Sequence, residues 1–237
     1  MRDPSAFPSF LPLIIAAFVV LVVGSMILSR IQARKRQEAL AAFAGRNGLA
    51  FDPETYRDFR DRWPDFKCLS QGENRYAYNV LSGPWRNRPL TGFDYHYETT
   101  TTDSKGEQQT HHHHFSAVVI SSSVPLRPLT IRAENVFDKV AGFFGKEDIN
   151  FESAEFNRKF FVSSTDRRWA YDVLHTRTME FLMASPRFAI QFSGDCVMAW
   201  KDSTFKPEDF AAAADVISGI LERLPEYVLQ QQGGQNA

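Results

Sequence analysis

Five histidines carry the clearest potential for chemistry in this sequence. Four form an internal run, His111, His112, His113 and His114, and the fifth is His96. Residues 89–98 alternate like a half-buried β-strand, and the run begins a second strand across the polar loop 99–110. Alternation then places His96 on one face of a hairpin with two of the four histidines, where three imidazoles could bind zinc or copper.

Two other interpretations of the histidine run stay open. Histidines titrate near neutral pH, so the hairpin could form a pH-sensitive edge. A strand that begins beside a polar loop is also commonly solvated. No cysteine or carboxylate is clearly placed by the sequence to complete a metal shell, and this weighs against a physiological metal site.

Signatures of the common enzyme classes are absent from the sequence. Asp172 and His175 fall within one helical turn and could form an acid–base pair, but no nucleophile in a recognised setting accompanies them. There is no P-loop, G-x-G-x-x-G, G-x-S-x-G or H-E-x-x-H pattern, and neither Cys68 nor Cys196 belongs to a C-x-x-C motif. Enzymatic activity is therefore uncertain, and the sequence favours a non-enzymatic protein.

An uncharged apolar segment near the N-terminus predicts where the domain is held. No charged residue occurs between Pro4 and Ser29. We expect a helix over residues 10–29, whose apolar stretch 10–28 would span roughly 28 Å at ~1.5 Å per residue, close to the ~30 Å hydrocarbon core of a bilayer. A cleaved signal peptide has its positive charge before the apolar run, whereas here the order is reversed, so we expect an uncleaved transmembrane helix.

Basic residues come directly after this segment and predict its direction. They are Arg30, Arg34, Lys35 and Arg36. The positive-inside rule places them at the cytoplasmic surface of the cell inner membrane, with residues 1–9 outside and the main domain in the cytoplasm. The cluster could also attract anionic lipid. It is too short, and the domain after it is too acidic, to suggest nucleic-acid binding.

The rest of the chain predicts one α+β domain. Of 237 residues, 43% are hydrophobic and 23% charged, which excludes both a disordered polar chain and a multi-span membrane protein. The whole chain carries a net charge of -1. Because Arg2 and Asp3 cancel and the basic neck carries +4, the chain after residue 36 carries -5. We expect a basic neck and stalk helix over 30–46, a cytoplasmic domain over 47–226 and a disordered tail over 227–237.

Within that domain, the patterning predicts one mixed, mainly antiparallel sheet with packed helices. The expected strands are 75–81, 89–98, 111–122, 129–133 and a hairpin formed by 187–192 and 196–200. The expected helices are 135–145, 167–183 and 207–224, the last with Pro207 at its first position and acidic residues in its first turn.

Short segments of the chain resemble a bacterial family of membrane-anchored proteins to which no activity is assigned. The resemblance is carried by Asn79-Val80-Leu81-Ser82-Gly83, Arg88-Pro89-Leu90, Phe93-Asp94-Tyr95 and residues 148–158. It covers most of the region from the neck to the final helix. It implies the architecture of an anchored domain and assigns no catalytic residue.

Two functional hypotheses result. In the first, a single-pass membrane protein uses its cytoplasmic domain to bind a membrane or cytoplasmic protein partner, or another ligand. In the second, the chain is a membrane-tethered enzyme, or a metal- or pH-responsive sensor, centred on His96 and the histidine run. In both, the lipid bilayer is a partner and nucleic acid is not.

Overall fold

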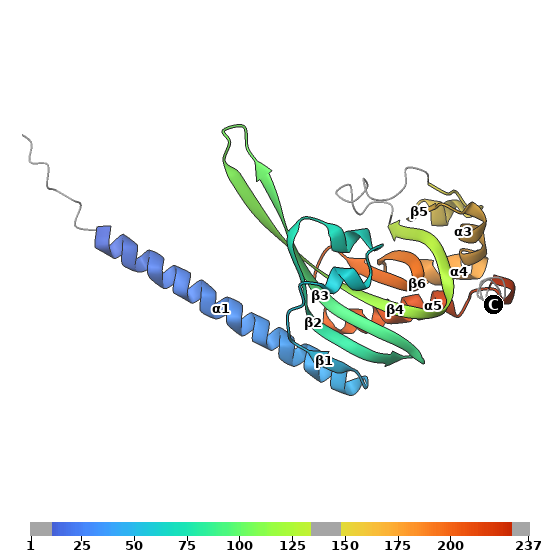
Figure 1. The fold of residues 1–237 in the computed structure, drawn as a ribbon, viewed down its shortest axis with the longest axis horizontal. Helices are drawn as coiled ribbons and strands as arrows, with labels where there is room; N and C mark the ends of the chain where they lie inside the picture. Colours follow the sequence, from blue (N-terminus) through green and yellow to red (C-terminus); the bar gives the residue numbers. More distant parts are fainter. Residues whose placement is uncertain (1–10, 134–147, 229–237) are drawn as a thin grey trace, which may run out of the picture.

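The computed structural model describes residues 11–133 and 148–228 (Figure 1). The predicted helix over 135–145 and the tail over 1–9 lie outside the described residues, as does nearly all of the predicted C-terminal tail.

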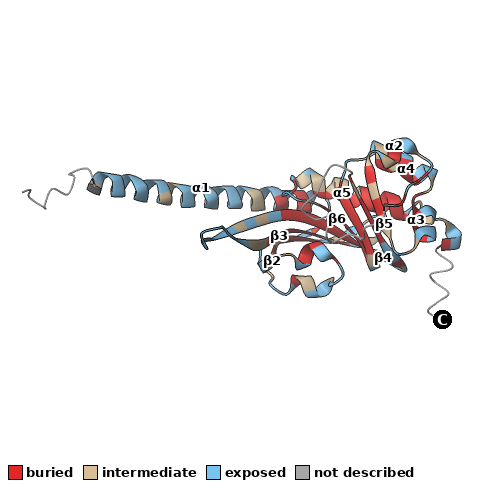
Figure 2. Ribbon diagram, turned by 90° about the horizontal axis from the view of Figure 1, so that it is seen from above, coloured by how far each residue is buried: buried red, intermediate tan, exposed pale blue. Residues whose placement is uncertain are grey.

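A single helix, α1 (Leu11–Arg46), contains the predicted stalk and residues 11–29 of the predicted membrane segment. Within the described residues, α1 is long and apolar enough to cross a membrane, and its apolar half is exposed (Figure 2). The helix ends where Gly48 adopts a left-handed φ of 68° and the Leu49 amide donates to the Ala44 carbonyl. Glycine accepts this conformation without strain, which explains why the helix stops at this point.

One six-stranded antiparallel sheet comes next in the chain. Its strands are β1 (Ala50–Asp52), β2 (Glu73–Trp85), β3 (Arg88–Thr102), β4 (Gln108–Ala133), β5 (Phe160–Ser164) and β6 (Ala189–Lys201). The first five pair in the order β1-β2-β3-β4-β5, and β6 pairs with the other edge of β4. This arrangement confirms the predicted α+β class with a mainly antiparallel sheet.

Two strand predictions were wrong because strands predicted to be short are continuous. Residues 129–133 are the end of β4 rather than a separate strand. Residues 187–192 and 196–200 belong largely to one strand, β6, because Gly194 (φ 59°) forms an irregularity within it opposite Leu126 instead of a hairpin turn. A bulge lets a strand bend while its pairing continues, and β4 and β6 curl together through this region (Figure 1).

Apolar side chains form a core on each face of the sheet. On one face, the last turns of α1 (Leu40, Phe43) pack with the final helix, α5 (Pro207–Leu221). On the other face, two short 3-10 helices, η1 (Phe59–Arg62) and η2 (Lys67–Ser70), cover an aromatic cluster that includes Phe93 and Tyr95. The sheet is therefore buried on both sides over its centre (Figure 2).

Three further helices flank the sheet, the first two packing against β5 and the third against α5. They are α2 (Ala154–Asn157), α3 (Arg167–Val173) and α4 (Thr176–Ala184). The sequence predicted one helix over 167–183, but the chain breaks at Leu174, which is buried in the core. The backbone of Leu174 is not helical (φ −98°, ψ 48°), so α3 ends there and α4 begins at Thr176.

Candidate functional site

A polar network joins α1 to the middle of the sheet. Asp94 on β3 is fully buried, and its carboxylate accepts four hydrogen bonds. Arg36 of α1 donates two of them, from Nε at 2.8 Å and from Nη2 at 2.6 Å. Asn79 Nδ2 donates at 2.8 Å and Ser116 Oγ at 2.5 Å. Arg36 Nη1 also donates to the Phe205 carbonyl at 2.9 Å, so one guanidinium ties α1 to two separate parts of the domain.

The local backbone explains how this network forms. Asn79 lies in a bulge of β2, between the residues paired with Asp94 and Gly92, and has a left-handed φ of 52°. This bulge lets the Asn79 side chain reach the carboxylate. Burial lowers the pKa of the Arg36 guanidinium, but hydrogen bonding to Asp94 and its negative charge together raise that pKa above its ordinary value. The pair is bidentate and charged, the strongest class of protein hydrogen bond.

The four basic residues predicted at the membrane surface are placed differently from one another. Arg30, Arg34 and Lys35 are exposed on α1, and Arg34 pairs with Glu38 one turn later at 3.0 Å. The Arg36 side chain is only 25% exposed and points into the domain. Three of the four thus remain accessible to lipid headgroups, and their role there stays a prediction.

The histidines lie on the hairpin of β3 and β4, beyond Asp94. His96 pairs with His114, and Glu98 pairs with His112. Alternation therefore places His96, His112 and His114 on the face that also carries Asp94. His111 and His113 lie on the opposite face, where His113 stacks on Tyr97 at 4.6 Å between ring centroids. The structure thus brings three of the five predicted residues together and separates the other two.

A carboxylate completes this cluster. His112 Nδ1 lies 3.3 Å from His96 Nε2 and 3.2 Å from Glu98 Oε1. His96 Nε2 lies 3.8 Å from the same carboxylate oxygen. Glu98 was missed as a site residue, although a sequence signal for it exists: it stands two residues after His96, on the same face of the strand.

Aromatic side chains of β2 cover the cluster from one side. Tyr76 stacks on the His96 ring at 4.5 Å between centroids. The Tyr78 hydroxyl is 3.1 Å from His114 Nδ1. Partial burial, together with the neighbouring histidines, lowers the pKa of His114. The cluster is therefore part of a packed layer of rings.

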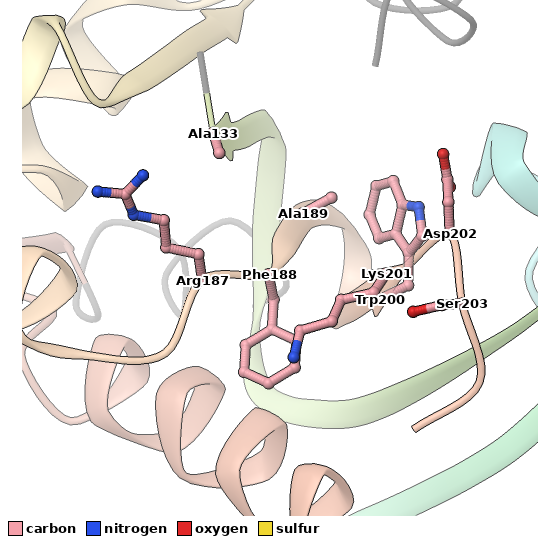
Figure 3. Close-up of a pocket in the computed structure, with 8 residues that line it drawn as sticks. All are labelled: Ala133, Arg187, Phe188, Ala189, Trp200, Lys201, Asp202 and Ser203. Carbon is pink, nitrogen blue, oxygen red and sulfur yellow. The ribbon is translucent and has the colours of Figure 1, made fainter. Parts of the chain in front are cut away.

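A separate cavity of about 400 Å³ lies at the curled β4–β6 pair (Figure 3). Its walls come from both ends of β6 and from the ends of neighbouring segments: Ala133, Arg187, Phe188, Ala189, Trp200, Lys201, Asp202 and Ser203. The Lys201 chain runs over the Phe188 ring, with Nζ 4.5 Å from its centroid. The pocket thus combines aromatic walls with charged side chains, a composition typical of small-molecule sites.

Other candidate residues do not form sites. Asp172 accepts a hydrogen bond from the Tyr227 hydroxyl at 2.7 Å, while His175 Nε2 contacts the Arg223 carbonyl at 3.0 Å. These two residues are each engaged in structural contacts with the segment after α5, and no hydrogen bond joins them in the described structure. Cys68 and Cys196 are buried thiols, and burial raises the pKa of both.

Comparison with known proteins gives one similar fold. No protein-family model matches the chain, and no curated protein sequence matches it either. The family resemblance seen in the sequence therefore stays a prediction. Among solved structures, the chain is similar to the crystal structure of the mycobacterial trehalose monomycolate transport factor A, TtfA, with a TM-score of 0.57 and 16% identity. The match covers 81% of this chain and 97% of that one, and at this identity it shows a shared fold.

Proposed function

We propose that this chain is a single-pass membrane protein whose domain lies on the cytoplasmic side and acts as a non-enzymatic binding module. The observation that carries the proposal is the junction between α1 and the sheet. Arg36 binds the buried Asp94, and Leu40 and Phe43, one and two turns later, are core residues. The helix that is able to cross a membrane is thus an element of the domain, so the bilayer would hold the domain at a fixed height and orientation.

The charge distribution supports the cytoplasmic orientation. Arg30, Arg34 and Lys35 are exposed immediately after the apolar half of α1, whereas Arg2 and Asp3 cancel on the other side. Short loops rich in lysine and arginine are retained in the cytoplasm. Each exposed basic residue near anionic lipid would add ~1 kcal/mol of attraction.

The ligand we propose is an amphipathic, lipid-like molecule. The similar structure is, by its name, that of a trehalose monomycolate transport factor. In this chain, Phe188 and Trp200 give the cavity apolar walls, and Arg187, Lys201 and Asp202 line it as well. Lys201 Nζ also pairs with Asp209 at 3.4 Å, so Arg187 is the cation that remains for a ligand. An acyl chain against the rings, with a polar headgroup at the charged side chains, fits this composition.

A photocrosslinking experiment tests the proposal. Full-length protein in nanodiscs would be irradiated with a lipid that carries a photoreactive acyl chain, and crosslinked peptides would be identified by mass spectrometry. We expect crosslinks in residues 187–203 and a several-fold loss with Ser203→Trp, which fills the cavity. Thr204→Trp is the matched control, because Thr204 is exposed nearby but does not line the cavity.

Two results would contradict the proposal. The first is an equal yield of crosslinks in the two tryptophan variants, since lipid contact would then be unrelated to the cavity. The second is turnover of a small substrate by the purified protein together with no recovered ligand or protein partner from intact membranes. That outcome would indicate a membrane-tethered enzyme.

A further inference from the structure

The geometry of the hairpin points to a metal site: we propose that His96, Glu98 and His112 bind a divalent transition-metal ion, with Zn²⁺ as the best match. Their ligand atoms are His96 Nε2, Glu98 Oε1 and His112 Nδ1, and they are separated by 3.3, 3.2 and 3.8 Å. A tetrahedral zinc ion with bonds of ~2.0–2.1 Å has ligand atoms ~3.3 Å apart. The three atoms thus already lie near the corners of such a site.

The surrounding contacts orient the buried ligand. His96 Nδ1 is 3.2 Å from the Asn74 carbonyl oxygen. A carbonyl can only accept a hydrogen bond, so Nδ1 carries the proton of the neutral ring, and the Nε2 lone pair faces the other two ligands. A histidine that binds a metal through one nitrogen commonly donates from the other to a backbone carbonyl or a carboxylate.

The Glu98 carboxylate is also held by a residue that is not one of the three ligands. Asn74 Nδ2 donates to Glu98 Oε1 at 2.7 Å, so one residue of β2 holds two of the three ligands. Asn74 adopts a left-handed φ of 46°, at the irregular start of the β2–β3 pairing. Asparagine tolerates this conformation better than most residues, and the turn directs both its carbonyl and its amide at the site.

The exposure of the three ligand side chains shows from which side an ion can enter the site. The His96 side chain is 4% exposed and that of Glu98 is 21% exposed, whereas that of His112 is 61% exposed. The site is closed on the sheet side and open at His112, so a fourth position would remain available to water or to an external ligand. An ion here would link β3 to β4 at the base of the projecting hairpin.

The opposite face of the hairpin provides a matched control. His111 and His113 belong to the same histidine run but contact Thr101 and Thr99 on the other side of the sheet. Weak metal binding by a polyhistidine run would involve all four residues about equally. If the folded hairpin forms a specific site, metal affinity depends on His112 and does not depend on His111 or His113.

The experiment uses full-length protein in nanodiscs, purified through a tag that contains no histidine and without a metal column. Zinc content is measured by elemental analysis after dialysis. Zinc affinity is measured by competition with a chromogenic chelator. The absorption spectrum of the protein loaded with Co²⁺ reports the coordination geometry. We expect about one ion per chain in the wild type. Removing a direct ligand, as in Glu98→Gln or His112→Gln, should weaken binding by more than about 100-fold, because about 100-fold is the largest loss expected when a residue that only hydrogen-bonds to a ligand is changed.

The controls separate a built site from weak binding to the run. His111→Gln and His113→Gln should keep zinc affinity within about threefold of the wild-type value. Asn74→Gly keeps the backbone conformation but removes the side-chain amide, and it should weaken zinc affinity by about 10-fold. Absence of stoichiometric zinc in the wild type would overturn the proposal. Equal losses in the His111→Gln and His112→Gln variants would overturn it too. Lipid crosslinking at the cavity, none of whose lining residues is a proposed metal ligand, is a separate readout, so the two proposals can fail independently.

Discussion

Replacing Arg36 with alanine removes the guanidinium that joins α1 to the sheet and leaves Asp94 buried. The carboxylate would keep Asn79 and Ser116 as donors but lose its only ionic partner among the described residues. Breaking a buried ion pair by removing one partner costs about 3–5 kcal/mol. Because the Arg36 side chain is 25% exposed, we expect about 3 kcal/mol, near the lower end of that range.

Thermal unfolding of the full chain in nanodiscs measures this effect. All four tryptophans, at positions 63, 85, 169 and 200, lie in the domain, so their fluorescence reports its unfolding. A loss of about 3 kcal/mol corresponds to a fall in Tm of about 6–12 °C for a domain of this size. Hydrogen exchange over residues 37–46 should also accelerate, because the end of α1 loses its attachment to β3.

Two variants show whether the ion pair is responsible. Arg34→Ala removes an exposed side chain two residues earlier and should cost at most about 0.5 kcal/mol. Combining Arg36→Met with Asp94→Asn removes both charges and should recover much of the lost stability, because no unpaired buried charge remains. If Arg36→Ala unfolds like Arg34→Ala, the ion pair does not fix the domain to its helix and the argument for a rigid junction fails.

Thiol labelling and glycine substitution test the orientation and packing of the domain. Burial raises the pKa of Cys196 to about 11 and that of Cys68 further, so both should alkylate slowly at pH 7 from either side. The rate at Cys196 should rise about tenfold per pH unit as the thiolate fraction grows, and fast, pH-independent alkylation would contradict its burial. Orientation therefore needs an exposed probe: Ser104→Cys, in the hairpin loop, should react with an impermeant maleimide only after cells are permeabilised, and labelling of intact cells would place the domain outside. Gly92→Ala should cost about 1–3 kcal/mol in chemical denaturation, because its Cβ would lie 2.9 Å from an aromatic ring of α5. Gly45→Ala, with nothing within 4 Å of the added carbon, should instead be neutral or stabilising, and equal effects of the two would refute the close contact.

Local patterns in the sequence predicted the elements that depend on local chemistry. The apolar half of α1 and the start of α5 at Pro207 both have the predicted positions, because hydropathy and helix-start signals act within one or two turns. The hairpin of β3 and β4 formed as expected, although pairing continues into the predicted loop 99–110 and leaves only residues 103–107 outside the strands. Strand alternation then placed His96 with His112 and His114. Glu98 was within reach of the same reasoning, since it comes two residues after His96.

The sequence patterns predicted strand ends wrongly where a strand continues through a residue that usually marks a turn. Gly194 and the prolines near residue 126 are typical of breaks, but β4 and β6 pair with each other on both sides of the irregularity. Whether a glycine forms a turn or a bulge depends on the strand beside it, and that neighbour is distant in the sequence.

The sequence by itself determined that an uncharged helix with a basic end precedes one α+β domain, because hydropathy, charge order and alternation are local properties. The tertiary structure decided how that helix is used. Arg36 and Asp94 are 58 residues apart, and only the packing of α1 on β3 makes a basic residue of the neck part of a buried ion pair. The cavity likewise combines Ala133 with residues 187–189 and 200–203, which the curl of β4 and β6 brings together. Such contacts depend on sheet order and strand curvature, and these properties emerge only when the whole sheet is assembled.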